Sequence, residues 1–211
     1  MGELGQVVAG IDEVGRGCLA GPVVACAVVL DERIPGVMDS KCLRPKERTR
    51  LAGIIRQKAQ ALGIGVVGQR VVDRINILQA TFMAMAMAVG RLSLPPSTLL
   101  IDGKFEIPLP TLTRFWTKHN QGNVPEQVAV VDGDAKIYAI AAASIVAKVY
   151  RDQMMVHFDS QWPVYGFARH MGYGTSYHRA MLVQHGPCPL HRRSFRGVVC
   201  ERTQGMHGGE E

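Results

Sequence analysis

The chain contains few cysteines, and their arrangement argues against two common kinds of site. The five cysteines among the 211 residues are Cys18, Cys26, Cys42, Cys188 and Cys200. No two of them form a Cys-x-x-Cys pair and their number is odd, so the sequence predicts neither a zinc site nor a disulfide framework. A reducing compartment fits this pattern best.

Long apolar runs are also missing. No run reaches the roughly 18 residues that a membrane span requires. Near the N-terminus the chain carries Glu3 and Asp12, where a secretory signal would have a basic segment followed by an apolar one. We therefore expect a cytoplasmic protein without a membrane segment.

The residues that are present favour one folded domain with an anionic partner. Hydrophobic residues make up 47% of the chain, which excludes a disordered tail. The length suggests a single domain. The formal net charge of +6 favours polyanionic partners, and nucleic acid first among them.

Short apolar runs and helical patterns alternate along the chain and predict a mixed sheet. We expect strands at residues 7–12, 23–30, 64–67, 98–101 and 128–131, and helices at 46–62, 75–92, 137–158 and 177–184. Gly63 is interpreted as the end of the first helix. Residues 104–127, with three prolines and little periodicity, are interpreted as a long loop. This order predicts an α/β fold with a five-stranded sheet and helices on both faces.

Three of the predicted strands end in acids. Asp12 and Glu13 end the first strand, Asp102 the fourth, and Asp134 follows the fifth. A single acid of this kind is most simply a polar turn. Acids at three strand ends, which meet at one edge of an open sheet, would repel each other unless a divalent cation neutralised them. Oxygen ligands favour Mg²⁺ or Mn²⁺, and four carboxylates can hold two ions roughly 3.5–4 Å apart.

A glycine-rich turn follows the first acid pair. In Gly15-Arg16-Gly17, the two glycines allow backbone N–H groups to approach an anion closely. Metal ligands beside an anion cradle indicate metal-assisted phosphoryl chemistry.

Six motifs, in order along residues 7–197, carry a resemblance to one family. The chain resembles ribonuclease HII, the type 2 ribonuclease H, in Asp12-Glu13-Val14-Gly15-Arg16-Gly17, Asp39-Ser40-Lys41, Ile101-Asp102-Gly103, Ala141-Ala142-Ala143-Ser144-Ile145-Val146-Ala147-Lys148-Val149, Gly172-Tyr173-Gly174-Thr175 and His191-Arg192-Arg193-Ser194-Phe195. Any one motif could arise by chance, whereas all six together are highly specific.

The resemblance implies a fold and a reaction. It implies one RNase H-like domain over residues 1–211, with a core at about 7–160, a helical C-terminal extension at about 161–200 and a frayed tail at 201–211. It implies cleavage of the RNA strand of RNA–DNA hybrids. It also implies incision 5′ of a single ribonucleotide in duplex DNA, as in ribonucleotide excision repair, leaving 3′-hydroxyl and 5′-phosphate ends.

The resemblance also implies a set of catalytic metal ligands, which would be Asp12, Glu13, Asp102 and Asp134. The fourth position departs from the family pattern, because the family usually has Lys-Gly-Asp or Lys-Ala-Asp where this chain has Asp132-Gly133-Asp134. Asp134 is preferred over Asp132 because Ala135-Lys136 follows it. Asp152 is a rival that we interpret as an acid on the helix surface or behind the ligands.

Further residues would bind the substrate by the same resemblance. Tyr173 would pack on the sugar of the next deoxynucleotide, and Lys41 and the Arg192-Arg193-Ser194 cluster would hold phosphates. A solvated basic face is the simpler alternative for Arg192 and Arg193, as a half-buried core tyrosine is for Tyr173. The predicted substrate-binding set is Gly15, Arg16, Gly17, Ser40, Lys41, Tyr173, Arg192, Arg193 and Ser194.

Three alternatives stay open at this stage. Ribonuclease HIII shares the sheet and a similar acid set but carries an N-terminal domain, for which Asp12 leaves no room. A recombination or transposition nuclease of the same fold would lack the Tyr173 motif. An inactive nucleic-acid-binding module would have no reason to keep four repelling acids. A monomer is expected, and recruitment by a sliding clamp is left open.

Overall fold

The computed structural model describes residues 6–38, 40–116 and 124–198, and it has a single five-stranded sheet at its centre. The strands are β1 (Val8–Val14), β2 (Val23–Val29), β3 (Ala61–Val67), β4 (Thr98–Asp102) and β5 (Glu126–Val130), in the spatial order β3-β2-β1-β4-β5. The mixed five-stranded sheet predicted from the sequence is thereby confirmed.

The strand directions bring the acid-bearing ends together. β1 pairs antiparallel with β2, as expected for a hairpin, and β2 pairs antiparallel with β3. β4 lies parallel to β1, and β5 lies parallel to β4. Because β1, β4 and β5 are parallel, their carboxyl ends share one edge of the sheet.

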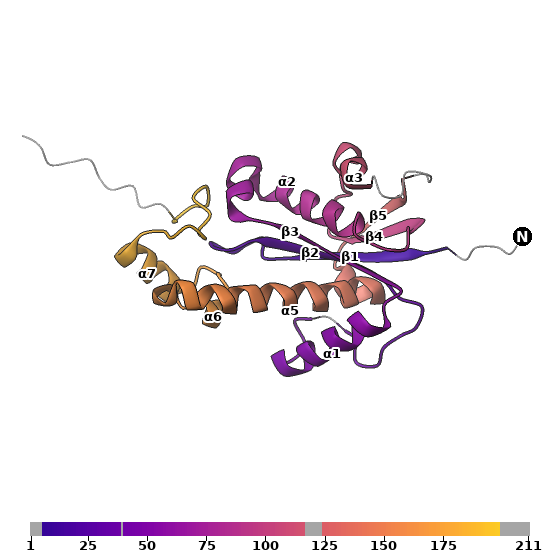
Figure 1. The fold of residues 1–211 in the computed structure, drawn as a ribbon, viewed down its shortest axis with the longest axis horizontal. Coiled ribbons are helices and arrows are strands. Elements are labelled where there is room, and N and C mark those ends of the chain that lie inside the picture. Colours follow the sequence, from indigo (N-terminus) through magenta and orange to yellow (C-terminus); the bar gives the residue numbers. More distant parts are fainter. Residues whose placement is uncertain (1–5, 39, 117–123, 199–211) are drawn as a thin grey trace, which may run out of the picture.

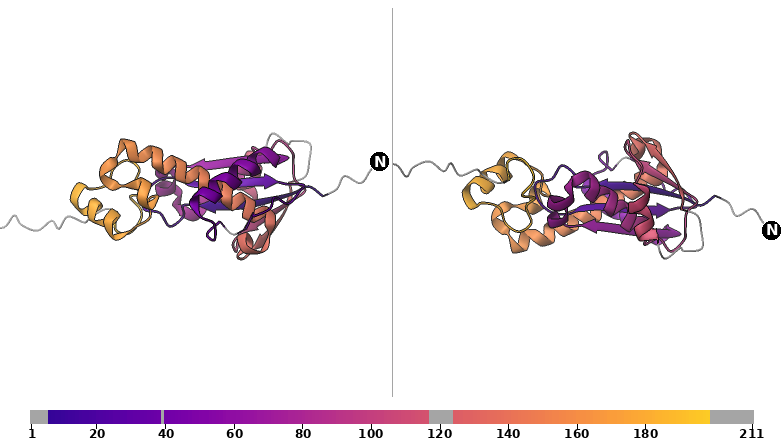
Figure 2. Two further views of the ribbon diagram at one scale, coloured as in Figure 1. Left: turned by 90° about the horizontal axis from the view of Figure 1, so that it is seen from below. Right: turned by 90° about the horizontal axis from the view of Figure 1, so that it is seen from above.

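Helices cover both faces of the sheet (Figure 1). They are α1 (Pro45–Lys58), α2 (Gln69–Val89), α3 (Leu109–Phe115), α4 (Gly133–Lys136), α5 (Tyr138–Gln161), the 3₁₀ turn η2 (Pro163–Tyr165), α6 (Phe167–His170) and α7 (Ser176–His185). α2 and α3 lie on one face, and α1 and α5 on the other. The C-terminal helices α6 and α7 extend beyond the sheet, as the two rotated views also show (Figure 2).

Glycines allow both central helices to pack directly on the sheet backbone. A Cβ added at Gly65 of β3 would lie 1.9 Å from the carbonyl oxygen of Ala84 in α2. On the opposite face, a Cβ at Gly10 of β1 would lie 2.2 Å from the carbonyl carbon of Ala139 in α5. Only glycine fits such contacts. The small first half of α5 therefore lies against β1, where the first acid pair sits.

Gly63 corrects one sequence prediction. The first helix ends at Lys58, and Gly63 lies inside β3, opposite Ala27 of β2. A Cβ on Gly63 would lie 2.0 Å from the carbonyl oxygen of Ala88. Gly63 therefore allows α2 to pack closely on β3. It plays no part in ending α1, which stops at Lys58.

The interpretation of residues 104–127 as a long loop was partly wrong. α3 forms within this segment, with Pro110 in its first turn, where a missing N–H costs nothing. Trp116, at the end of α3, is 5% exposed and packs in the core beneath α2. Lys118 and His119 lie outside the described residues.

Other boundaries differ by a turn or less, except at α2. This helix begins at Gln69, ahead of the predicted position, and bends at Asn76, whose φ is 64°. The Asn76 side chain accepts hydrogen bonds from the N–H groups of Leu78 and Gln79, which starts the helix again. Across the described residues, no helix combines the length and apolarity of a membrane span. The predicted tail at 201–211 lies outside them.

Candidate active site

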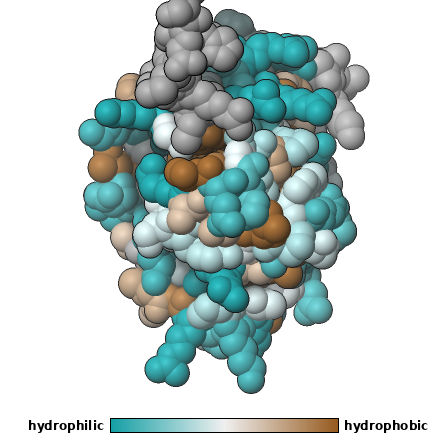
Figure 3. All heavy atoms as spheres, turned by 90° about the vertical axis from the view of Figure 1, so that its left-hand side faces the viewer, coloured by the Kyte–Doolittle hydropathy of each residue, from teal (hydrophilic) through white to brown (hydrophobic). Residues whose placement is uncertain are grey.

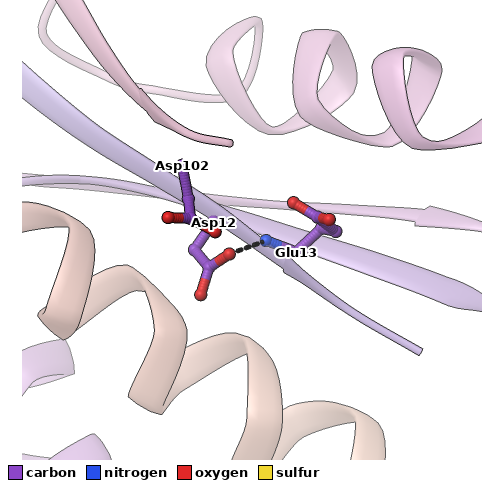
Figure 4. A group of neighbouring side chains, drawn as sticks. All are labelled: Asp12, Glu13 and Asp102. Atoms are coloured by element: carbon purple, nitrogen blue, oxygen red, sulfur yellow. Dashed lines mark hydrogen bonds between the residues drawn. The ribbon is translucent and has the colours of Figure 1, made fainter. Parts of the chain in front are cut away.

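Three carboxylates meet at the carboxyl ends of β1 and β4. The register pairs Ile11 with Ile101, so Asp12 and Asp102 follow as neighbours. Together with Glu13, they offer ligand oxygens that all lie within 4.8 Å of one another. Figure 4 shows Asp12 beside Asp102, and Glu13 next to them along β1, with its N–H donating to Asp12 Oδ1 at 2.7 Å. The convergence of acids predicted from the strand ends is confirmed for these three.

The surroundings of these three carboxyl groups disfavour their charged forms. Burial raises the pKa of Asp12 well above its usual range, and the nearby charge of Glu13 raises it further. Burial also raises the pKa of Glu13, against the opposing effect of Arg16, whose Nη1 lies 3.1 Å from Glu13 Oε1. Burial raises the pKa of Asp102 as well. Bound cations would lower all three pKa values.

One of the carboxylate oxygens lacks an internal partner. Glu13 Oε2 is buried and has no hydrogen-bond donor among the residues that the structure describes. A buried acceptor without a donor is uncommon and calls for a ligand or an ion. The donor set is made only of oxygen atoms, which suits Mg²⁺ or Mn²⁺. These residues therefore fit a divalent metal centre.

Asp134 lies beside this group on the short helix α4. It is 5% exposed, and its Oδ2 accepts a hydrogen bond from Lys41 Nζ at 2.8 Å. The preceding Gly133 donates its N–H to Asp102 Oδ1 at 2.7 Å, and the charge of Asp134 contributes to the raised pKa of Asp102. The fourth acid is thus next to Asp102, although it is not one of the three whose ligand oxygens lie within 4.8 Å of one another.

The two rivals of Asp134 are both paired with basic side chains. Asp132 is exposed, with a left-handed φ of 55°, and its carboxylate lies 3.9 Å from Lys136 Nζ. Asp152 accepts a hydrogen bond from Lys148 at 2.9 Å and lies 3.8 Å from Arg48. Neither rival lines the cavity that the four carboxylates share.

That cavity gathers most of the predicted site. It measures about 320 Å³, and its walls are formed by Asp12, Glu13, Val14, Gly15, Arg16, Gly17, Ser40, Lys41, Arg48, Asp102, Asp134, Ser144, Lys148 and Tyr173. All four predicted acids, the Gly15-Arg16-Gly17 turn, Ser40, Lys41 and Tyr173 are therefore together. Arg192, Arg193 and Ser194 are absent from its lining.

The position of Arg192 corrects a prediction. Its side chain is fully buried and donates to the carbonyl oxygens of Gly21 and Arg16, so it cannot contact a phosphate in solution. The backbone N–H groups of Arg193 and Ser194 donate to the carboxylate of Asp73, as does the hydroxyl of Ser194. Phosphate binding by the latter two stays a prediction.

Three polar residues of the cavity had no role in the sequence-based site. Ser144 and Lys148 are four residues apart on α5 and therefore share a face, and Ser144 Oγ lies 2.9 Å from Ser40 Oγ. The third, Arg48, comes from α1. The spacing of four along the small-residue helix was the available signal for the first two.

Tyr173 stands at the mouth of the cavity, 42% exposed. Lys148 Nζ lies 5.8 Å from its ring centroid, and its carbonyl oxygen lies 2.8 Å from His178 Nδ1. Tyr173 is therefore contacted at the face of its ring and at its backbone. The side chain is half-buried, and the exposed part of it is open to a ligand.

The surrounding surface is suited to a hydrated partner. Figure 3 views the end of the molecule that carries α7, and on this face hydrophilic residues predominate, with hydrophobic ones in small groups between them. Obligate protein interfaces are usually more apolar than a face of this kind.

Comparisons with known proteins agree with this site. The family model described as Ribonuclease HII matches residues 9–198. A ribonuclease HII from Geobacter metallireducens is 52% identical over 195 residues, which cover 92% of this chain and 85% of the relative. The crystal structure of ribonuclease H2 from Pyrococcus horikoshii aligns with a TM-score of 0.71 and 26% identity, covering 90% of this chain and 94% of that one. The RNase HII in a PCNA:RNase HII complex from Archaeoglobus fulgidus has the same fold, with a TM-score of 0.64 and 24% identity over 96% of this chain and 98% of that one. The motifs, the acid edge of the sheet and these matches agree, and the chain belongs to the ribonuclease HII family.

Proposed function

We propose that the four carboxylates of the cavity carry out the ribonuclease HII reaction on two kinds of substrate. One is the RNA strand of an RNA–DNA hybrid, and the other is a single ribonucleotide embedded in duplex DNA, incised on its 5′ side. Water attacks the phosphorus of one phosphodiester, and the bond from phosphorus to the 3′ oxygen breaks. The products are a 3′-hydroxyl and a 5′-phosphate. The observation that carries the proposal is that one cavity is lined by all four acids, the glycine turn and Tyr173.

Asp12, Glu13, Asp102 and Asp134 would hold two Mg²⁺ or Mn²⁺ ions. Such ions, when bound, would lower the pKa of the attacking water and stabilise the oxygen that leaves. The carboxylates keep their positions through the bonds already described, from Gly133 N–H to Asp102 and from Lys41 to Asp134. The charge of Lys41 would also favour a phosphate of the substrate beside Asp134.

The remaining cavity residues would select the substrate. Within one nucleotide, only the 2′-hydroxyl separates RNA from DNA, so its recognition must rest on close polar contacts. The backbone of Gly15-Arg16-Gly17 can supply them, because no side chain at the two glycines blocks approach. Tyr173 offers an exposed ring for the neighbouring sugar. Lys148 and Ser40 would add polar contacts to the phosphates on either side.

The family and the acid cavity bear differently on the alternatives to this function. Membership in the ribonuclease HII family favours junction cleavage over hybrid-only cleavage. An inactive binding module would not need the buried acids, whose mutual repulsion lowers stability. A sliding clamp as partner, a monomeric state and a cytoplasmic location stay predictions.

The deciding experiment uses a 5′-labelled DNA duplex with one embedded ribonucleotide, incubated with Mg²⁺ or Mn²⁺ and then with EDTA. An all-DNA duplex and an RNA–DNA hybrid are run in parallel. We expect one metal-dependent cut 5′ of the ribonucleotide, cleavage of the hybrid, and an intact all-DNA duplex. Cleavage of the hybrid alone would contradict the junction recognition, and no cleavage of any substrate would contradict the enzyme assignment.

A further inference from the structure

Two fully buried arginines lie under the loop that begins with the glycine turn. Arg151 comes from α5 and Arg192 from the C-terminal segment, and neither side chain is exposed. Residues 15–22 form this loop, here named the recognition loop. Within the described part of the chain, neither arginine takes part in a salt bridge. Burial of a guanidinium without a carboxylate is very costly unless its N–H groups find other acceptors.

Arg192 finds acceptors for two of its three guanidinium nitrogens in the recognition loop, and its buried Nη2 has none among the described residues. Its Nη1 donates to the carbonyl oxygen of Arg16 at 2.8 Å, and its Nε to that of Gly21 at 3.0 Å. Its backbone N–H donates to the carbonyl oxygen of Leu19 at 2.8 Å. Although burial lowers the pKa of Arg192 to about 10, the side chain stays protonated at neutral pH. One arginine thus holds both the glycine turn and the end of the loop.

Arg151 connects the same loop to the segment before Tyr173. Its Nη2 donates to the carbonyl oxygen of Ala20 at 3.0 Å and its Nε to that of Pro22 at 2.9 Å. Its Nη1 donates to the carbonyl oxygen of Met171 at 2.8 Å, two residues before Tyr173. A single planar guanidinium therefore fixes the distance between the recognition loop and the Tyr173 segment.

The contact between Arg151 and the glycine turn is close. Gly15 has a φ of +94°, and a Cβ built on it would lie 2.2 Å from Arg151 Nε. The backbone of the turn therefore rests directly on the guanidinium. A shift of the side chain would be transmitted to Gly15-Arg16-Gly17 without any intervening flexible group.

We propose that Arg151 and Arg192 are positioning residues that set the separation between the recognition loop and Tyr173, and thereby the selectivity for a lone ribonucleotide over an RNA–DNA hybrid. This inference rests on the proposed function, because it assigns recognition to those two elements. Neither arginine touches the substrate, and each acts through backbone carbonyls.

The selectivity follows from the number of productive registers. In a hybrid, each successive nucleotide carries a 2′-hydroxyl, so a displaced loop still meets one nearby. A lone ribonucleotide offers a single register, in which loop and Tyr173 must both be correctly placed. A misplaced loop or Tyr173 should therefore lower the cleavage rate more on a lone ribonucleotide than on a hybrid.

The test replaces each arginine with lysine, which keeps the charge but cannot make the forked set of bonds. Steady-state kinetics are measured with a duplex containing one ribonucleotide and with a hybrid of the same sequence. We expect Arg151→Lys and Arg192→Lys to lower kcat/KM at least ~10-fold more on the lone ribonucleotide than on the hybrid, mainly through kcat. Because both substrates are tested on one preparation, any unfolded fraction cancels in the ratio.

The matched control is Arg91→Lys, since Arg91 also donates to a backbone carbonyl, that of Ile64, but does not line the cavity. Its substrate ratio should equal that of the unaltered protein. If Arg151→Lys does not fold, Arg151→Gln, which has amide donors and no charge to bury, takes its place with the same expectation. An unchanged ratio in the folded arginine variants would overturn the positioning role. Failure of the unaltered protein to cut either duplex would instead overturn the proposed function.

Discussion

Two neighbouring groups of buried like charges are balanced in different ways in this protein. The carboxylates of Asp12, Glu13 and Asp102 lie within 4.8 Å of one another, and burial raises the pKa of each. The guanidiniums of Arg151 and Arg192 are buried more completely, but between them they donate to five backbone carbonyls. Every nitrogen of the Arg151 guanidinium has a carbonyl acceptor, whereas Glu13 Oε2 among the acids and Nη2 of Arg192 have no partner among the described residues.

The difference separates a binding site from a structural support. Buried charge that is satisfied by the chain's own backbone holds that backbone in place. Buried charge that repels its neighbours and leaves an oxygen such as Glu13 Oε2 without a donor is prepared for an external cation. Removal of charge from the two groups should therefore change stability in opposite directions.

The largest effect is expected for Asp12→Asn. Loss of a metal ligand should lower kcat on either substrate by about 1,000-fold. In EDTA the same change should raise the free energy of unfolding, because one of three repelling charges disappears. Cleavage rates and urea unfolding in EDTA measure the two effects, and a variant that is both inactive and less stable would contradict the comparison.

The second prediction tests whether Asp134 is itself a metal ligand. Asp134→Asn should lower kcat by more than the roughly 10–100-fold typical of residues that only support metal ligands. Asp132→Asn, two residues away and exposed, is the matched control and should leave cleavage unchanged. Near-normal activity of Asp134→Asn would remove it from the ligand set.

Arg151→Met tests the opposite charge group. This change leaves the carbonyl oxygens of Ala20, Pro22 and Met171 without their donors, each at a cost of about 1–3 kcal/mol. We expect the free energy of unfolding to fall by about 3 kcal/mol or more, as measured by urea titration. Arg50→Met, which removes an exposed arginine paired with Glu47, should change little. Equal changes in the free energy of unfolding for the two substitutions would show that the buried hydrogen bonds of Arg151 add no more stability than an exposed ion pair.

A smaller, pH-dependent effect is expected at a pair of histidines behind Tyr173. His178 Nδ1 must donate to the Tyr173 carbonyl at 2.8 Å, so its Nε2 accepts from His191 Nε2, 2.9 Å away. His191 Nδ1 in turn accepts the N–H of Cys188 at 2.9 Å. Both rings are neutral in this arrangement, and either added proton would break a bond.

Burial, together with His178, lowers the pKa of His191 from the usual 6.5 to about 4. The unfolded chain therefore binds a proton first, so the folded state loses stability as pH falls from about 6.5 towards 4. Urea midpoints across this range should fall more steeply for the unaltered protein than for His191→Gln. If the urea midpoints of the two proteins fell equally with pH, the assignment of His178 and His191 as a neutral pair would be contradicted.

The sequence predicted the acid edge because strand ends are readable from local patterns. Apolar runs that end in Asp12-Glu13 and Asp102 fix both the strands and the edge on which they meet. The glycine turn was recognisable directly after the first acid pair, and the family motifs then identified Tyr173. In each case the signal lies in consecutive residues, so no knowledge of tertiary packing was needed.

Packing between distant segments explains the errors. Gly63 resembled a helix terminator, because nothing local reveals that Ala88 packs against it. Arg192 stands in a basic run that resembled a surface, yet its acceptors lie in the recognition loop, more than 170 positions away in the sequence. Trp116 entered the core through α3, a helix that its proline-rich segment concealed.

The central claim is that the acid edge requires an external cation, and thermal unfolding with and without Mn²⁺ tests it directly. Ligands that bind only the folded state raise its Tm. We predict that Mn²⁺ raises the Tm of the unaltered protein clearly, and that Asp12→Asn shows little or no shift. The account would be contradicted if Mn²⁺ left the Tm of the unaltered protein unchanged, or if it raised the Tm of both proteins equally.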